Sequence, residues 1–115
     1  MSVKIYHNPR CSKSRQTLAL LEEKGIKPEI VEYLKTPPSQ EELSDILNML
    51  GMAPRDLMRR KEAPYKEQGL DDPAKSDDAL IAAMHDTPVL IERPIVVANG
   101  KAAIGRPPEQ VLDIL

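Results

Sequence analysis

The sequence has a single cysteine, Cys11, and contains neither phenylalanine nor tryptophan. One cysteine excludes an intramolecular disulfide, and two histidines add too few ligands for a structural zinc site, so we expect no bound metal or cofactor. The three tyrosines offer little surface for stacking on bases, which argues against a nucleic-acid partner. Because the chain cannot form an internal disulfide, we expect it in the reducing cytoplasm.

Long apolar runs are also missing. No stretch approaches the roughly 20 residues that a membrane-spanning helix needs. The N-terminal residues lack the apolar core of a secretory signal, so we expect no membrane association. The 115 residues, 41% hydrophobic and 30% charged, are typical of one soluble globular domain covering residues 1–115.

Residues 1–21 contain no acidic side chain, and Glu22 is the first acidic residue of the chain. Four basic residues precede it: Lys4, Arg10, Lys13 and Arg15. The whole chain nevertheless has a net charge of -2. A local positive field in an acidic protein indicates an anion near the N-terminus.

The hydrophobic pattern predicts a βαβ unit followed by a helical block and a ββα unit. Strands are expected at 3–6 and 30–33, with a helix between them that Ser12 or Ser14 could cap and that Gly25 ends. Residues 39–85 read as a helical insertion. Within it we predict helices at 39–50, 54–61 and 77–85, and an irregular segment at 63–73.

After the insertion, a strand at 95–97 leads through the turn signal Asn99-Gly100 into a returning strand at 101–104. A final helix follows, with Val111, Leu112 and Leu115 facing inward. The predicted fold class is therefore α/β, with a mixed sheet in βαβ…ββα order and an inserted helical subdomain.

Cys11 has the surroundings of a reactive cysteine. It follows a strand and lies at a predicted helix start, where free backbone N–H groups and the helix dipole favour the thiolate. The neighbours His7, Arg10, Lys13 and Arg15 add positive charge, and His7 could tune the cysteine pKa electrostatically. The thiolate is the nucleophilic form of cysteine, so this position suits nucleophilic catalysis.

The residues after Cys11 restrict the possible chemistry. Cys11 and Ser14 form a C-x-x-S motif, so there is no resolving cysteine and any redox cycle must use an external thiol. Ser14 lies one helical turn along, and its hydroxyl could bind the thiolate or merely cap the helix. Thr17 stands where a C-x5-R phosphate loop would need arginine, which excludes a phosphatase-type cradle.

Several arginines are candidates for binding an oxyanion. Arg93 directly precedes Pro94 and a predicted strand, Arg106 follows the hairpin, and Arg59 and Arg60 lie in the helical block. Taken singly, each arginine fits a surface salt bridge. Together they supply planar guanidinium groups suited to a tetrahedral oxyanion, although spacing alone does not show that they converge.

Four motifs occur in the order Tyr6-His7-Asn8-Pro9-x-Cys11-x-x-Ser14-Arg15-x-Thr17-Leu18, Tyr33-Leu34-x-x-Pro37-Pro38, Arg93-Pro94-Ile95-Val96-Val97 and Arg106-Pro107. In these motifs the chain resembles the glutaredoxin-dependent arsenate reductases, the ArsC family. Within that family it is most similar to a subgroup of short bacterial YfgD-like proteins. The resemblance covers essentially the whole chain.

The resemblance implies a thioredoxin-like fold with an inserted helical subdomain. It places the functional residues of the family on the nucleophile Cys11, the thiolate-tuning His7 and Ser14, the oxyanion-binding Arg59, Arg93 and Arg106, and the cis-proline Pro94. One departure directly follows the cysteine. Family members usually carry Gly-Thr there, whereas this chain has Ser12-Lys13, which offers less backbone freedom and one more charge.

The activity implied is reduction of arsenate to arsenite through an adduct on the Cys11 thiolate. Glutathione is then the co-substrate, and glutaredoxin the partner that removes it. Two alternatives remain open. One is a glutathione-dependent thiol reductase acting on another substrate. The other is a Spx-type transcriptional regulator that binds RNA polymerase and needs no oxyanion chemistry; retention of all three arginines favours an enzyme.

Overall fold

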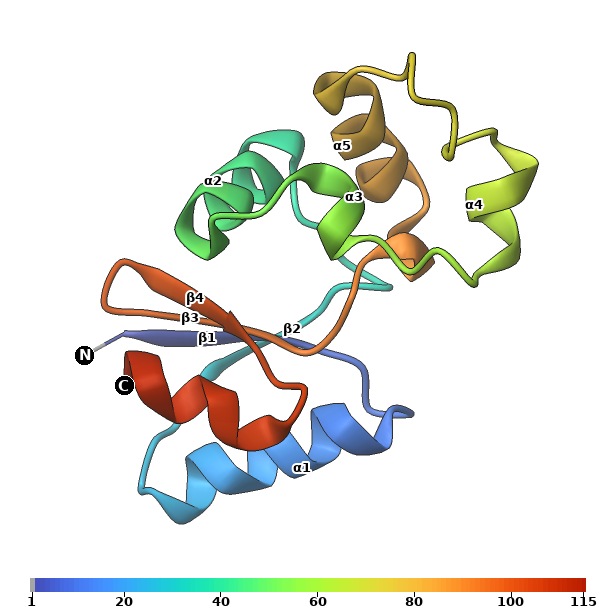
Figure 1. Ribbon diagram of the computed structural model, residues 1–115. Helices are drawn as coiled ribbons and strands as arrows, with labels where there is room; N and C mark the ends of the chain where they lie inside the picture. The colour runs from blue at the N-terminus through green and yellow to red at the C-terminus, as the bar shows by residue number, and fades with distance from the viewer. Residues whose placement is uncertain (1) are drawn as a thin grey trace. The chain divides into compact units, whose positions relative to one another are not determined.

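The computed structural model describes residues 2–115, and the chain divides into two compact units (Figure 1). The first unit joins the segment through Thr36 to the segment from Arg93 onward. The second unit is the intervening segment, Pro37–Glu92. The predicted helical insertion at 39–85 falls inside the second unit.

The first unit is built on a four-stranded sheet with the strand order β2-β1-β3-β4. β1 pairs in parallel with β2 and antiparallel with β3, and β3 forms a hairpin with β4. The strands span Val3–His7 (β1), Glu29–Glu32 (β2), Ile95–Ala98 (β3) and Lys101–Ile104 (β4). The predicted mixed sheet of an α/β protein is therefore confirmed.

The turn between β3 and β4 is the tight hairpin that Asn99-Gly100 predicts. Asn99 has a φ of 55° and Gly100 a φ of 71°, and two left-handed central residues are typical of a type I′ turn. The side-chain amide of Asn99 also donates to the carbonyl oxygen of Ile114 at 2.9 Å. This bond ties the hairpin to the end of the chain.

Two helices, α1 (Ser12–Glu23) and η2 (Pro108–Ile114), pack together on the sheet (Figure 1). Their core residues and those of the strands are Val3, Ile5, Leu21, Val96, Ala98 and Val111. The C-terminal helix that we predicted is a 3-10 helix, in which side chains three residues apart lie in one row. Pro108 and Val111 are therefore buried, whereas Leu112 and Leu115 are only half-buried.

The second unit is helical, as predicted, with α2 and α5 packed against each other. A capping box formed by Ser39 and Glu42 begins α2, and the left-handed Gly51 ends it. The helices are α2 (Gln40–Leu50), α3 (Pro54–Leu57), α4 (Ala63–Glu67), α5 (Asp77–Asp86) and η1 (Pro88–Leu90). None of the helices described between residues 2 and 115 is both long and apolar enough to cross a membrane.

Two predictions for this unit were wrong. α3 ends at Leu57 rather than near residue 61, because Met58 forms a β-bridge with Ile91 and the N–H of Glu92 donates to the carbonyl oxygen of Leu57 at 2.8 Å. The segment expected to be irregular begins with α4, whose first turn contains Pro64. Proline suits a first helical turn, because the N–H groups there have no acceptor within the helix and the absence of one costs no hydrogen bond.

Candidate active site

Cys11 is the N-cap residue of α1. The turn after β1 brings its N–H to the carbonyl oxygen of Asn8 at 3.0 Å, and its own carbonyl oxygen accepts from the N–H of Arg15. Its backbone is extended, with φ -94° and ψ 123°, and its side chain is buried with 8% exposure. The thiol therefore lies at the N-terminal end of α1, where the first backbone N–H groups have no partner within the helix and can stabilise a thiolate.

The side chain of Ser14 does not cap the helix but makes two hydrogen bonds to the turn before it. Its Oγ lies 2.6 Å from Nδ1 of His7 and accepts from the N–H of Asn8 at 3.0 Å. Because the Asn8 N–H already donates to the oxygen, the hydroxyl proton is available for Nδ1 of a neutral His7. This buried pair joins the end of β1 to the first turn of α1, and it holds the turn that precedes Cys11.

His7 is buried at the end of β1, and its surroundings decide which protonation state it adopts. Burial lowers the pKa of His7, Glu32 acts to raise it and Arg15 to lower it, and the result lies below the ordinary value. The imidazole is therefore mainly neutral near pH 7. A neutral His7 adds no positive charge beside Cys11, and a role of His7 and Ser14 in tuning the thiolate stays a prediction.

The predicted low pKa of Cys11 is confirmed in direction. Burial acts to raise the pKa of the thiol, but the backbone N–H groups of Ser14 and Lys13 and the charges of Arg93 and Arg106 outweigh it. These hydrogen bonds and charges stabilise the thiolate directly.

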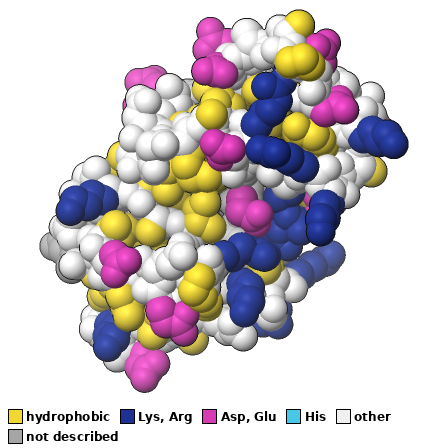
Figure 2. Space-filling model, viewed as in Figure 1, with side chains coloured by type: hydrophobic (Ala, Val, Ile, Leu, Met, Phe, Trp, Pro, Cys, Tyr) yellow, Lys and Arg dark blue, Asp and Glu magenta, His cyan; other side chains and the backbone are white. Residues whose placement is uncertain are grey.

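The charges involved are only partly those that the sequence indicated. The side chains of Arg10, Lys13 and Arg15 are exposed, and Figure 2 shows Lys and Arg side chains gathered over the start of α1 and the adjoining turn. The guanidinium groups that act on the thiol instead come from residues 93 and 106. The exposed cluster is placed to attract an anion to this face rather than to shift the thiol pKa.

Arg106 is brought to Cys11 across most of the chain. Its Nη2 lies 3.9 Å from Sγ of Cys11, and its Nε donates to the carbonyl oxygen of Arg93 at 3.0 Å. Nε and Nη1 of Arg93 are buried. The Arg93–Pro94 bond is cis, as predicted, and so is the Arg106–Pro107 bond, which was not predicted.

Gly105 is a site residue that the sequence reasoning missed. Its N–H donates to the carbonyl oxygen of Pro94 at 2.9 Å. A Cβ atom at this position would collide with Oγ1 of Thr17 and lie 2.8 Å from Cγ of Pro94. The glycine directly before Arg106 was the available signal, because close packing of the Thr17 and Pro94 side chains against this backbone requires a residue without a side chain.

Arg59 lies in the second unit, in the extended segment after α3. Its Nη1 is 2.6 Å from Glu62 and its Nε 4.0 Å from Glu92. Arg60 pairs instead with Asp56 at 3.3 Å. Neither arginine is helical, although the helix predicted at 54–61 includes both, and the two make different ion pairs. A role for Arg59 in oxyanion binding stays a prediction.

The departure at Ser12-Lys13 is accommodated without strain. Both residues have helical backbone in the first turn of α1 and expose their side chains. No positive φ is therefore needed at the position that usually carries glycine in the family, and Lys13 still contributes its backbone N–H to the thiol.

Among residues 2–115, no group of three or more His, Cys, Asp or Glu side chains is placed to hold a metal ion.

The fold and the site together define a class: a thioredoxin-like protein with one cysteine at the start of its first helix and two arginines whose charges lower the pKa of that cysteine. Within this class, the ArsC family model matches residues 6–114. The chain therefore belongs to the ArsC family.

Individual relatives agree with this assignment. The chain is 64% identical to the protein named "Uncharacterized protein YfgD" of Escherichia coli (strain K12), over 98% of this chain and 96% of the relative. It is 59% identical to a protein named "Arsenate reductase" of Neisseria meningitidis serogroup A, over 98% and 97%. A solved structure titled "Arsenate reductase from Vibrio cholerae" is 62% identical, with a TM-score of 0.98 over 100% of this chain and 98% of that one.

Proposed function

We propose that this protein reduces arsenate to arsenite, with glutathione and glutaredoxin as the external reductants. The observation that carries the proposal is the buried thiol of Cys11, whose pKa is lowered at a helix start where Arg106 lies 3.9 Å from Sγ. Relatives at 59% identity and above include proteins named arsenate reductase, which supports the same substrate for this chain.

The first step joins arsenic to the enzyme. Arg93 and Arg106 hold the arsenate oxygens through charge-assisted hydrogen bonds. The Cys11 thiolate attacks arsenic, an S–As bond forms, and one As–O bond breaks to release water or hydroxide. Arsenic is still in the +5 state. A lowered thiol pKa supports this step because it increases the fraction of the nucleophilic thiolate at a given pH.

The reduction itself needs thiols from outside, because Cys11 is the sole cysteine of the chain. A glutathione thiolate attacks the adduct and displaces a second oxygen as hydroxide. A glutaredoxin thiolate then attacks the glutathione sulfur. The new S–S bond leaves as a mixed disulfide, and the electron pair of the broken As–S bond stays on arsenic, which becomes +3. Hydrolysis of the remaining As–S bond releases arsenite and restores the Cys11 thiolate.

A coupled assay tests the proposal. Arsenate, glutathione, glutaredoxin and glutathione reductase are combined, and arsenate-dependent oxidation of NADPH is followed. We expect turnover by the natural protein and none by Cys11→Ser, which should stay folded because the fold uses no disulfide. Absence of arsenate-dependent turnover, with a folded protein and a titratable thiol, would leave thiol reduction of another substrate as the better interpretation.

A further inference from the structure

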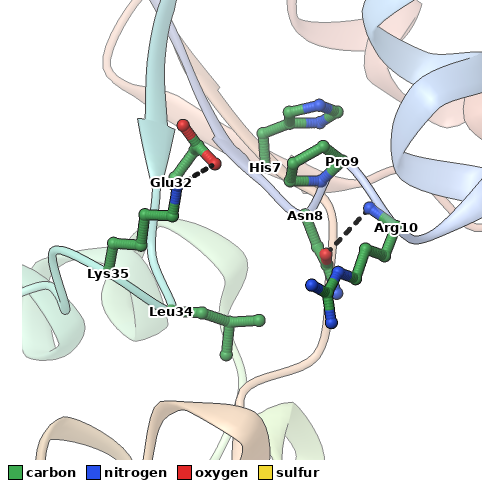
Figure 3. A pocket seen from close by; sticks show the side chains of 7 residues that line it. All are labelled: His7, Asn8, Pro9, Arg10, Glu32, Leu34 and Lys35. Atoms are coloured by element: carbon green, nitrogen blue, oxygen red, sulfur yellow. Dashed lines mark hydrogen bonds and ion pairs between the residues drawn. The ribbon is translucent and has the colours of Figure 1, made fainter.

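A cavity of about 300 Å³ lies beside the turn that leads to Cys11 (Figure 3). One wall is the turn itself, residues 7–10, and the other is the segment that ends β2 and follows it, with Glu32, Leu34 and Lys35. Both walls belong to the first unit. The volume is at the lower end of the range for sites that bind small molecules.

The charges of the cavity suit a zwitterion. Arg10 supplies a cation from the turn wall, while Lys35 and Glu32 supply a cation and an anion from the β2 wall. Nζ of Lys35 lies 3.6 Å from Oε1 of Glu32, and the lysine side chain is 78% exposed. An exposed pair of this kind is weak, so both groups are available to a ligand that offers matching charges.

Apolar atoms line the space between these charges. Leu34, which is 43% exposed, points from the β2 wall toward the Asn8 and Arg10 side of the cavity in Figure 3. The ring of Pro9 belongs to the opposite wall. A ligand with a short aliphatic backbone and charged ends would cover this exposed leucine and place its charged groups on Arg10, Glu32 and Lys35.

The cavity is distinct from the proposed oxyanion site. Its lining comes from the turn and the β2 wall, whereas the arginines that act on the Cys11 thiol are Arg93 and Arg106. Arg10 directly precedes Cys11 in the chain, so one wall of the cavity ends at the residue before the nucleophile. A second reactant could thus approach Cys11 while the arginines hold an anion.

We propose that this cavity binds a small peptide thiol that carries an ammonium and carboxylates, the chemical class of glutathione, and presents its sulfur to Cys11. The inference rests on the proposed function, because it names the binding site of the external reductant. The carboxylates pair with Arg10 and Lys35, the ammonium pairs with Glu32, and the aliphatic part packs on Leu34.

The test uses a disulfide exchange that needs no arsenate. The Cys11 thiolate attacks one sulfur of oxidised glutathione, a Cys11–glutathione disulfide forms, and one glutathione thiolate leaves. The rate constant is measured by mass spectrometry of the intact protein. It is compared with that for bis(2-hydroxyethyl) disulfide, which undergoes the same chemistry without charged groups.

Two substitutions in the cavity have matched controls outside it. Leu34→Trp fills the cavity, and Ile30→Trp makes the same change at a residue of similar exposure, 48%, on the same edge of the sheet. Lys35→Gln removes a cation from the cavity, and Lys27→Gln removes one from an exposed position that is not part of its lining. The lysine pair has equal effects on net charge, so long-range steering is matched.

We expect Leu34→Trp and Lys35→Gln to slow the reaction with oxidised glutathione about three- to tenfold. The reaction with the uncharged disulfide and both controls should stay within about twofold of the natural protein. Equal slowing of both disulfides, or no slowing of either, would overturn the proposal. If this selectivity holds while arsenate turnover is absent, the cavity is supported and the proposed function is what fails.

Discussion

Adding a single methyl group at Gly105 should change both the stability of the protein and the properties of the Cys11 thiol. In Gly105→Ala the new Cβ would collide with Oγ1 of Thr17 and lie 2.8 Å from Cγ of Pro94. Thr17 is fully buried on α1 and its hydroxyl donates to the carbonyl oxygen of Lys13 at 2.8 Å. The proline ring is rigid. Relief must therefore come mainly from movement of the segment that carries Arg106.

The size of the effect follows from these contacts. Overpacking of a well-packed site typically costs about 1–3 kcal/mol, and we expect a loss of that size in the free energy of unfolding of Gly105→Ala. Displacement of Arg106 would remove a charge that lowers the Cys11 pKa, so the pKa should rise toward that of a free thiol. A misplacement of about 1 Å can reduce kcat/KM by about 100-fold.

Three measurements check this prediction: urea denaturation, the rate of thiol alkylation against pH, and kcat/KM for arsenate. The matched variant is Thr17→Ala combined with Gly105→Ala, which removes the colliding hydroxyl and methyl groups. The double variant should recover part of the stability lost and part of the shift in thiol pKa, as expected for residues in contact. A Gly105→Ala protein with natural stability and natural thiol pKa would refute the reasoning.

Other predictions concern the charges and the titrating groups of the site. Lysine substitution keeps the charge but loses the planar guanidinium, so we expect kcat/KM for arsenate to fall about ten- to a hundredfold for changes at each of Arg59, Arg93 and Arg106. Arg60→Lys is the control and should be nearly silent in the same assay, since Arg60 makes a separate ion pair with Asp56. Glu62→Gln removes the carboxylate that lies 2.6 Å from Arg59, so if Arg59 binds the substrate, KM for arsenate should fall; an unchanged KM would argue against that role. The rate of Cys11 alkylation should have its pH midpoint below about 8.5, the value of a free thiol, and a midpoint at or above it would contradict the thiolate assignment. The folded-state pKa of His7 is lowered, so the unfolded chain binds more protons at mildly acidic pH; the stabilising contribution is present above about pH 6.5 and is lost as the pH falls through the folded-state pKa. Urea denaturation should show this loss in the natural protein and a shallower slope in His7→Gln.

Much of the fold was predictable because its signals are local. The hairpin follows from Asn99-Gly100, whose residues adopt the left-handed conformations that a two-residue turn requires. The capping box at Ser39 begins α2, and the spacing of the apolar residues in this helix places Leu43, Ile46 and Leu47 on one buried face. The sequence also shows that any redox cycle would have to use an external thiol, since no residue other than Cys11 can form a disulfide.

The boundaries that we predicted wrongly depend on contacts between distant segments. The spacing after Pro54 allows a helix through residue 61, but pairing of Met58 with Ile91 ends it at Leu57. The pattern of neighbouring residues cannot indicate a pairing partner that lies more than thirty residues away. Tertiary contacts override intrinsic propensity at such places, because propensity differences amount to less than about 1 kcal/mol per residue.

The features of the candidate site likewise fall into those predicted from local sequence and those set by tertiary contacts. The sequence by itself determined that Cys11 lies at the start of a helix and that the first acidic residue is Glu22. Together these features indicate a cysteine thiolate in a positively charged region suited to an anionic ligand. Only the tertiary structure decided that Ser14 binds His7 instead of capping the helix, and that Arg106, far along the chain, reaches Sγ. The reason is physical: helix starts and turns are set by neighbouring residues, whereas the position of a guanidinium group beside a thiol depends on how the sheet brings β1 and β3 together.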